Sequence, residues 1–299
     1  AGELNGNIHV IAPNGDWSSF ILKYQNEVIH IYTPGDLIMD RRNSQWKWIS
    51  IARAGTGLIL LQDNGTPQNP NDKVTFRNSW MDQNSRNIAP ENIYSIVQDH
   101  DNTLWVGTNS GLFTIPAHVD FAASNQCERI VIPRNDGSGL GDYLLDGEQI
   151  NSIAIDGANR IWIGTASSGV FLIQITTNEM GGKDIETIAH FTTENSLMPS
   201  DNVLSIAIND FTGEVFIGTA SGLVSYMSDA IEPEKVVKPK IIISNIRYFH
   251  ILNYHINLYI LYIKIFFMET RTKTVRLNSE KTISHELFKI KIGTTNKTF

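Results

Sequence analysis

The sequence predicts an all-β protein made of β-propeller blades of four antiparallel strands each, as an incomplete ring of about four blades. Three observations support this prediction. A unit of 54 to 57 residues repeats along the chain, each unit consists of short apolar runs separated by turn residues, and no helical pattern of useful length occurs before residue 240. A repeat of this period, with room for about four strands, is the sequence signature of a propeller blade.

An aromatic residue followed by Gly-Thr, and then by a second glycine, marks each repeat. Trp105, Trp162 and Phe216 carry this pattern, at separations of 57 and 54 residues. A weaker copy surrounds Trp48, which lies 57 residues before Trp105. The four copies place the blades near residues 40–90, 91–148, 149–200 and 201–230.

Within each repeat, the first apolar run contains Ser-Ile and the second contains the aromatic residue. The triplets Leu-Trp-Val, Ile-Trp-Ile and Val-Phe-Ile suit strands that are buried on both faces. The turns between the two runs are Asp-x-x-Asn or Asp-Phe-Thr-Gly, and Asn and Gly tolerate a positive φ. An outer fourth strand is predicted over Arg129–Ile132 in one blade and over Glu186–Ala189 in another.

The N-terminal residues contain what remains of a preceding blade, over Asn7–Ile11 and Trp17–Ile21. Propellers close with about four to eight blades, and closure hides the strand edges that an open arc would expose. We therefore expect residues 1–230 to be the later part of a larger propeller. The chain begins without a charged and then apolar leader, so any export signal is expected to have been removed or to lie outside the given sequence.

Composition and charge exclude several classes of protein. A hydrophobic fraction of 41% with 18% charged residues is typical of a globular protein. The single cysteine, Cys127, excludes an internal disulfide and argues against a Cys-based zinc site. Residues 241–299 hold 6 Lys, 3 Arg and 3 Glu, so the net charge of −7 leaves −13 on residues 1–240. Such an acidic domain repels phosphates, and no nucleic-acid partner is expected.

The composition changes abruptly after a linker over residues 231–240. Residues 241–299 lack Ala, Pro, Asp, Gln and Trp, and Ile, Lys, Asn, Tyr and Phe fill 32 of the 59 positions. AT-rich codons encode those five amino acids, so the first interpretation is a frame-shifted or read-through end outside the fold. A membrane segment over Tyr248–Met268 is an alternative, long enough at about 20 residues but rich in polar side chains. An isolated amphipathic or disordered appendage is the third.

The repeated pattern S-I-x-x-D-x-x-N/G-x-L/I-W-I/V-G-T-x-x-G-L, over about residues 40–230, resembles the two-component regulator propeller repeat. In that family, propellers form the extracytoplasmic sensing half of hybrid histidine kinases that respond to glycans, and related propellers occur in bacterial surface proteins. The resemblance implies a non-catalytic, exported sensing or protein-interaction module in the periplasm or at the cell surface. It also implies a glycan ligand or a partner surface protein, no cofactor, and membrane association only through domains outside this chain.

The last repeat has a more particular resemblance. Asn195–Ile206 followed by Gly213–Tyr226 is similar to the final blade of the propeller component of the type IX secretion sortase complex. There, a small β-sandwich domain follows the blade. Here, a linker could begin at Ile231, but no sandwich pattern follows it.

The residues that recur in every repeat are interpreted as structural. The glycines allow tight turns or a close approach of backbones, the serines are expected to form hydrogen bonds within or between blades, and the aromatic residues are expected to fill the core between blades. These positions are Ser95, Ser152, Ser205, Gly107, Gly164, Gly218, Trp105, Trp162 and Phe216.

Function is expected where the blades differ. If the Ser-Ile strand is innermost, its variable neighbours line the mouth of the central channel, where amides and a tyrosine suit a neutral glycan or peptide. The alternative is that they bind only water. The excursion Arg134–Tyr143 is a second candidate surface, since loops on a rigid scaffold often bind partners. The candidate ligand-binding residues at the channel mouth are Asn92, Tyr94, Gln149, Asn151 and Asn202.

No catalytic or metal-binding residues are predicted. The run Asp99–Asn102 has oxygen ligands suited to Ca²⁺ but lacks the twelve-residue loop with its distal Glu, so it is interpreted as a turn. The sequence contains no Gly-x-Ser-x-Gly, His-Glu-x-x-His or Walker-type loop. The alternative function is a propeller-based glycan lyase or hydrolase, which would require carboxylates, His or Tyr to converge on the channel mouth.

Overall fold

The structure is a computed structural model, and its strands fall into two separate units. It describes residues 8–11, 15–63, 72–134, 136–138, 140–177, 183–229, 240–242, 262–266 and 272–276. The chain divides into Ala1–Glu232 and Pro233–Phe299. Every regular element in the described ranges is a β-strand, and these ranges contain no helix long and apolar enough to cross a membrane.

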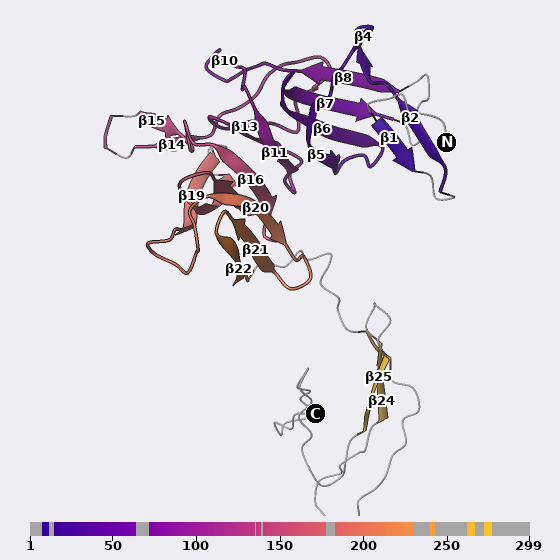
Figure 1. Ribbon diagram of the computed structural model, residues 1–299. Helices are drawn as coiled ribbons and strands as arrows, with labels where there is room; N and C mark the ends of the chain where they lie inside the picture. The colour runs from indigo at the N-terminus through magenta and orange to yellow at the C-terminus, as the bar shows by residue number, and fades with distance from the viewer. Residues whose placement is uncertain are drawn as a thin grey trace, which may run out of the picture. The chain divides into compact units, whose positions relative to one another are not determined.

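The first unit contains four successive antiparallel meanders, which we call blades 1 to 4 (Figure 1). Blades 1 and 3 have four strands each, and blades 2 and 4 have three. Blade 1 is β5 (Thr33–Met39), β6 (Trp46–Arg53), β7 (Gly57–Gln62) and β8 (Lys73–Arg77), and blade 2 is β11 (Ile93–Gln98), β12 (Leu104–Thr108) and β13 (Gly111–Ile115). Blade 3 is β16 (Ile150–Ile155), β17 (Ile161–Thr165), β18 (Val170–Thr177) and β19 (Lys183–Phe191), and blade 4 is β20 (Val203–Ile208), β21 (Glu214–Thr219) and β22 (Gly222–Met227).

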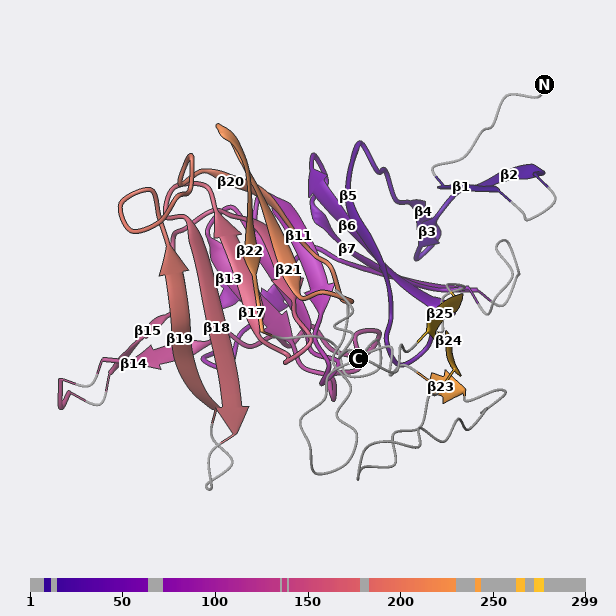
Figure 2. The same ribbon diagram turned by 90° about the horizontal axis from the view of Figure 1, so that it is seen from below.

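The first strands of the blades lie next to one another in chain order. β5 contacts β11, β11 contacts β16, and β16 contacts β20. Each sheet therefore meets the next along its first strand, and the remaining strands follow outward (Figure 2). Successive meanders that meet along their first strands are the arrangement of propeller blades, which confirms the predicted fold class.

Left-handed residues close the hairpins between the first and second strands. Asn102 and Asn159 have φ values of 65° and 60°, and Gly213 has a φ of 74°. These are the Asn and Gly positions that the turn pattern predicted, because both residue types tolerate this backbone conformation.

The apolar core is divided among the interfaces between blades. Trp105 of blade 2 packs in one cluster with Ile153 of blade 3, and Trp162 of blade 3 packs in another with Ile206 of blade 4. This confirms that the recurring tryptophans fill the space between blades. Phe216, their counterpart on blade 4, is only half-buried.

One predicted outer strand is confirmed and the other is wrong. β19 includes Glu186–Ala189 and completes blade 3. Arg129–Ile132 does not complete blade 2: β14 (Val131–Pro133) pairs instead with β15 (Gly141–Tyr143) in a projecting hairpin (Figure 2). Among the residues that the structure describes, the edge of blade 2 receives an isolated bridge between Thr114 and Glu128 in place of a fourth strand. Closing a short local loop costs less entropy than reaching back to the sheet, which favours the hairpin.

The N-terminal residues cover the side of blade 1 that faces away from blade 2. β1 (Ile8–Ile11) pairs with β2 (Trp17–Phe20), and β3 (Lys23–Tyr24) pairs with β4 (Glu27–Val28). Between and after them, Leu22 and Ile29 share a buried cluster with Ile49, Ile51, Ile59 and Leu61 of blade 1. Successive residues of a strand point to opposite faces, so these blade 1 side chains oppose Trp48 and Leu58, which cluster with blade 2.

The end of blade 4 is fastened to blade 3 by a buried arginine. The Arg160 side chain donates to Ser228 Oγ at 2.7 Å and to Asp229 Oδ1 at 2.8 Å, and its Nε donates to Asp156 Oδ2 at 2.8 Å. Arg160 lies at the start of β17, so one side chain holds the last described residues of blade 4 in place.

The second unit contains one small antiparallel sheet. Its strands are β23 (Lys240–Ile242), β24 (Tyr262–Phe266) and β25 (Thr272–Arg276), in the order β23-β24-β25. The frame-shift, membrane-segment and appendage interpretations of residues 241–299 fall mostly on residues outside the described ranges.

Two short strands of the first unit lie between blades 1 and 2 in the sequence. These strands, β9 (Trp80–Met81) and β10 (Asn87–Ile88), pair with each other.

Candidate functional site

A serine–isoleucine hydrogen bond repeats between the first strands of consecutive blades. The N–H of Ile153 donates to Ser95 Oγ at 3.1 Å, and the N–H of Ile206 donates to Ser152 Oγ at 2.9 Å. Both serines are buried. This confirms for Ser95 and Ser152 that the recurring serines form hydrogen bonds between blades, whereas Ser205 of blade 4 is exposed.

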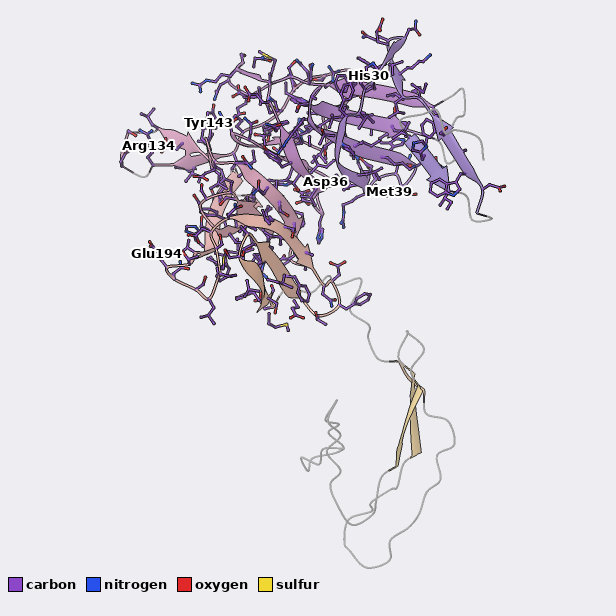
Figure 3. All side chains as sticks on the ribbon, in the orientation of Figure 1. His30, Asp36, Met39, Arg134, Tyr143 and Glu194 are labelled. Atoms are coloured by element: carbon purple, nitrogen blue, oxygen red, sulfur yellow. The ribbon has the colours of Figure 1, made fainter. Side chains whose placement is uncertain are left out.

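In blade 1, Asp36 takes the place of the serine. Its Oδ2 accepts from the N–H of Ile96 at 2.8 Å, and its own N–H donates to Ser50 Oγ at 2.8 Å. Figure 3 shows Asp36 on β5, close to the next blade. Sequence reasoning missed this residue because the weaker repeat has no Ser-Ile pair ahead of Trp48, and β5 begins at Thr33, ahead of residue 40.

A buried aspartate accepts the indole N–H of the recurring tryptophan. Trp105 Nε1 donates to Asp99 Oδ2 at 2.9 Å, and Trp162 Nε1 donates to Asp156 Oδ2 at 3.1 Å. Burial raises the pKa of Asp99, although the hydrogen bond from Trp105 acts in the opposite direction. The carboxylate considered for Ca²⁺ therefore holds a tryptophan in the core.

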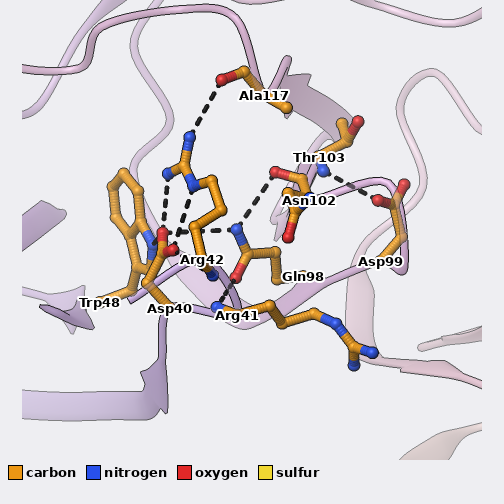
Figure 4. Close-up of polar contacts among 9 residues, drawn as sticks. All are labelled: Asp40, Arg41, Arg42, Trp48, Gln98, Asp99, Asn102, Thr103 and Ala117. Carbon is orange, nitrogen blue, oxygen red and sulfur yellow. Dashed lines mark hydrogen bonds and ion pairs between the residues drawn. The ribbon is translucent and has the colours of Figure 1, made fainter. Parts of the chain in front are cut away.

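The corresponding aspartate of blade 1 joins a network that reaches blade 2 (Figure 4). Asp40 Oδ2 accepts from Trp48 Nε1 at 2.9 Å and from Arg42 Nη2 at 2.7 Å. Burial alone would raise the pKa of Asp40, but the hydrogen bonds from Arg42 and Trp48 outweigh it and hold that pKa below its usual value. Gln98 of blade 2 accepts from the N–H of Arg41 at 2.6 Å.

Three of the five predicted site residues occupy equivalent positions just before the first strands of blades 2, 3 and 4. We call Asn92, Gln149 and Asn202 the amide rim. Their backbone carbonyls accept hydrogen bonds from the residue that follows Gly-Thr in the same blade, at 3.3, 2.9 and 2.9 Å. The structure therefore brings these residues to the same end of three neighbouring blades.

The side chains of the five candidates have different surroundings. Gln149 Nε2 donates to Asn151 Oδ1 at 2.8 Å, and Asn151 Nδ2 donates to the carbonyl of Val203 at 2.7 Å, so this pair links blade 3 to blade 4. Tyr94 is half-buried at the position that corresponds to Asn151. Asn202 Oδ1 is buried and forms no hydrogen bond with the described residues.

A cavity of about 390 Å³ opens at this same end, next to blade 2. Pro90, just before Asn92, and Ser110, in the turn between β12 and β13, both line it. Ile88 and Leu112 add apolar surface, and Asn87, Arg129 and Asp146 add polar groups. Sequence reasoning missed this cavity because its walls come from separate segments that follow no common pattern.

Arg129 is held rigidly in the wall of the cavity. Its guanidinium forms an ion pair with Asp146 and stacks on the ring of Tyr143, 3.8 Å from the ring centroid. The Tyr143 hydroxyl in turn accepts from Asn84 Nδ2 at 2.7 Å. Tyr143 ends the excursion predicted as a contact surface, while Arg134 lies farther out on its hairpin (Figure 3).

The candidate metal ligands and the single thiol in the described ranges have structural surroundings. These residues contain no group of three or more His, Cys, Asp or Glu arranged to hold a metal ion. Asp101, in the candidate Ca²⁺ turn, accepts from Asn159 Nδ2 of the next blade at 2.9 Å. Cys127 is buried, and burial together with the charge of Asp82 raises the pKa of its thiol to about 12.

Comparisons with known proteins agree with this architecture. Residues 87–110 and 144–167 match the two-component regulator propeller family. The chain is 25% identical to PorZ, an essential bacterial surface component of the type-IX secretion system of Porphyromonas gingivalis, with a TM-score of 0.64. That match covers 80% of this chain and 32% of the PorZ chain, so this chain spans about a third of its length. Comparison with curated proteins gave no match.

Two other solved structures are similar at lower TM-scores. The extracellular domain of the hybrid two-component system BT4673 from B. thetaiotaomicron is 18% identical, over 66% of this chain and 27% of that one, with a TM-score of 0.33. An ancestral GH74 enzyme is 15% identical, over 67% and 23%, with a TM-score of 0.40. The sheet order of the first unit is that of a β-propeller module, and two of its segments, residues 87–110 and 144–167, match the two-component regulator propeller family.

Proposed function

We propose that this chain is a non-catalytic, extracytoplasmic propeller module that binds a glycan ligand or a partner surface protein. One observation carries the proposal: the recurring polar residues are used between and within blades, whereas the residues that differ gather at one end, beside a cavity of about 390 Å³. The similarity to PorZ supports a place at the bacterial surface. The module could belong to a glycan-sensing regulator or to a secretion-related surface protein, and the similarity to PorZ favours the second.

The chemistry of the cavity suits a short oligosaccharide. Its volume lies within the range of roughly 300–1,000 Å³ that is usual for small-molecule sites. Apolar surface from the half-buried Ile88 can pack against the carbon face of a sugar ring, and Asn87, Arg129 and Asp146 provide donors and acceptors for hydroxyl groups. The amide rim lies at the same end of blades 2, 3 and 4, but its three residues do not line this cavity.

The test is direct binding of a panel of plant and host oligosaccharides to the full chain, measured by isothermal titration calorimetry. Ala89 is an exposed residue that lines the cavity, so Ala89→Trp fills it without removing a core contact. We expect this variant to weaken binding at least about tenfold, which corresponds to about 1.4 kcal/mol.

The matched control is Ala158→Trp, at an exposed turn between β16 and β17, outside the cavity. It should bind like the unmodified chain. Equal loss in both variants would contradict the assignment of binding to this cavity. No binding by any oligosaccharide would contradict the glycan ligand and leave the partner surface protein. Release of cleaved products in the same incubations would favour the alternative lyase or hydrolase.

A further inference from the structure

A second cavity, of about 450 Å³, opens beside blade 1. Its walls come from the β3–β4 hairpin, from the segment between β4 and β5, from the turn between β6 and β7, and from β8. It shares no lining residue with the cavity next to blade 2. We call it the aromatic cavity, because four of its lining side chains are rings: Tyr24, His30, Tyr32 and Phe76.

Two of these rings belong to the core and two are presented to solvent. Tyr24 and Phe76 are half-buried and pack against the apolar cluster on the far side of blade 1. Tyr32 is 70% exposed, and its ring is stacked on that of His30, with the centroids 5.6 Å apart and the planes at 12°. The Tyr32 ring therefore adds an aromatic wall that the apolar core does not use.

The turns that form the remaining walls have an unusual backbone. Gln25 and Ala54 have φ values of 51° and 50°, and Gly55 has a φ of 93°. A left-handed conformation is unfavourable for residues with a Cβ, and such residues gather at ligand sites. Thr56 Oγ1, next to Gly55, donates to the carbonyl of Glu91 ahead of β11 at 2.5 Å. The wall at the β6–β7 turn is therefore fixed before any ligand arrives.

Glu27 brings a negative charge to the aromatic cavity. It pairs directly with Tyr24 across the β3–β4 hairpin, so both side chains project from the same face of that hairpin. Lys23 and Arg53, the cations next to lining residues in the sequence, do not line the cavity. The lining residues therefore carry one carboxylate and no ammonium or guanidinium group.

We propose that the aromatic cavity binds a quaternary ammonium group, of the kind that choline carries. Ring faces attract a cation, and aromatic walls are the usual protein surroundings of a quaternary ammonium ligand. A primary amine would bring N–H donors that ring faces satisfy poorly, and a neutral sugar would gain nothing from the charge of Glu27. This site is separate from the cavity assigned to a glycan and does not depend on it.

The test compares choline with 3,3-dimethyl-1-butanol, which has the same shape but no charge, in nuclear magnetic resonance titrations of the full chain. We expect choline to bind at least about threefold more tightly, because only the cation is attracted by the rings and by Glu27. Tyr32→Leu and Glu27→Gln should each weaken choline binding at least about threefold. Tyr32→Phe, which keeps the ring, should bind choline like the unmodified chain.

Matched substitutions outside the aromatic cavity are the controls. Phe211 is an exposed ring in the turn between β20 and β21, and Glu194 is exposed on the loop before blade 4, away from His30 (Figure 3). Phe211→Leu and Glu194→Gln should leave choline binding unchanged. Ala89→Trp, which fills the other cavity, should also leave it unchanged, so the two sites are tested separately.

Three results would overturn the proposal. They are equal affinity for the two probes, no detectable choline binding by the unmodified chain, and choline binding that survives both Tyr32→Leu and Glu27→Gln. Circular dichroism melting of each variant shows whether a loss of binding is a loss of the fold. Glu27 is exposed, so Glu27→Gln keeps the test valid even where Tyr32→Leu unfolds.

Discussion

At the scale of single residues, neighbouring blades are held together by one acceptor on each first strand and one backbone N–H on the next. Ser95 and Ser152 supply a hydroxyl, while Asp36 supplies a carboxylate in the same role. The geometry needs an oxygen acceptor at this position, and either side chain provides one. A buried N–H that loses such a partner keeps the full cost of its desolvation.

Ser95→Ala should therefore destabilise the chain, because it leaves the N–H of Ile153 buried without its partner. We expect a loss of about 1–3 kcal/mol in the free energy of unfolding. Ser205→Ala is the matched control, since Ser205 is exposed, and it should change stability by less than about 0.5 kcal/mol. Urea unfolding of the full chain measures both, and equal losses would show that the hydrogen bond between blades is not the cause.

The roles of individual residues could be predicted only in part. Recurrence alone indicated that Ser95 and Trp105 are structural, and the contacts between blades confirm it. The hydrogen bond from Trp105 to Asp99 was missed, because the strand periodicity of two does not indicate which side chains meet across a hairpin turn. A signal was present: where Phe216 replaces the tryptophan, Asn209 replaces the aspartate, so both members of the pair change together.

The candidate site was predicted less completely than the structural residues. Asn92, Gln149 and Asn202 share one end of the blades, as their equivalent positions in the repeat suggested. Asn151 could not be placed from sequence, because its contact with Val203 depends on how two blades pack. Their role in ligand binding remains a proposal.

At the scale of strands and blades, the close approach of neighbouring first strands decides where a side chain is allowed. Gly164 lies under Val203 of the next blade, and Gly218 occupies the same position in a blade whose outward face is uncovered within the described residues. The same substitution at the two positions therefore tests whether the glycine serves the strand itself or the following blade.

Gly164→Ala should lower the free energy of unfolding by about 1–3 kcal/mol, because its methyl group would lie 2.5 Å from Val203 Cγ1 in a packed interface. Gly218→Ala should cost less than about 0.5 kcal/mol, since the nearest atom is the Ser205 hydroxyl, the end of a side chain that can rotate. Chemical denaturation of both variants gives the comparison. A cost at Gly218 as large as that at Gly164 would assign the glycine to its own blade.

Strands were predicted best where the repeat is strong. The Trp-Gly-Thr strands of blades 2 and 3 are β12 and β17, and both are buried on both faces as expected. β5 was not anticipated, because Pro34 and Gly35 interrupt its strand pattern and the pairing with β6 is irregular there. Val131–Pro133 has strand chemistry, but sequence cannot tell a blade edge from a local hairpin partner.

At the scale of the whole molecule, the repeat determined the fold class and the change in composition marked a separate C-terminal region. The structure divides the chain between Glu232 and Pro233. Each blade of the first unit buries apolar surface against its neighbours, and Arg160 fastens the end of blade 4 through Asp229. The contacts described for residues 8–229 are therefore made within the first unit.

Deletion of residues 241–299 should leave the first unit folded. We expect its melting temperature to change by less than about 2 °C, the shift that corresponds to roughly 0.5 kcal/mol for a domain of this size. The control ends the chain at residue 202, which removes blade 4 and uncovers Trp162 and Val170, and should lower the melting temperature clearly. Differential scanning calorimetry measures both. A large decrease after the first deletion would show that the second unit supports the propeller.

The hydrogen bonds between first strands also have a direction. At each of the three interfaces, the earlier blade supplies a side-chain acceptor and the later blade supplies a backbone N–H donor. The two faces of a blade therefore differ, and this difference specifies the order in which blades pack. During synthesis on a ribosome, the newest blade would cover the one before it and expose a fresh surface of its own. At every stage of elongation, the last folded blade would therefore expose an equivalent apolar face. Chaperones that bind apolar surface would meet the same type of binding site throughout synthesis.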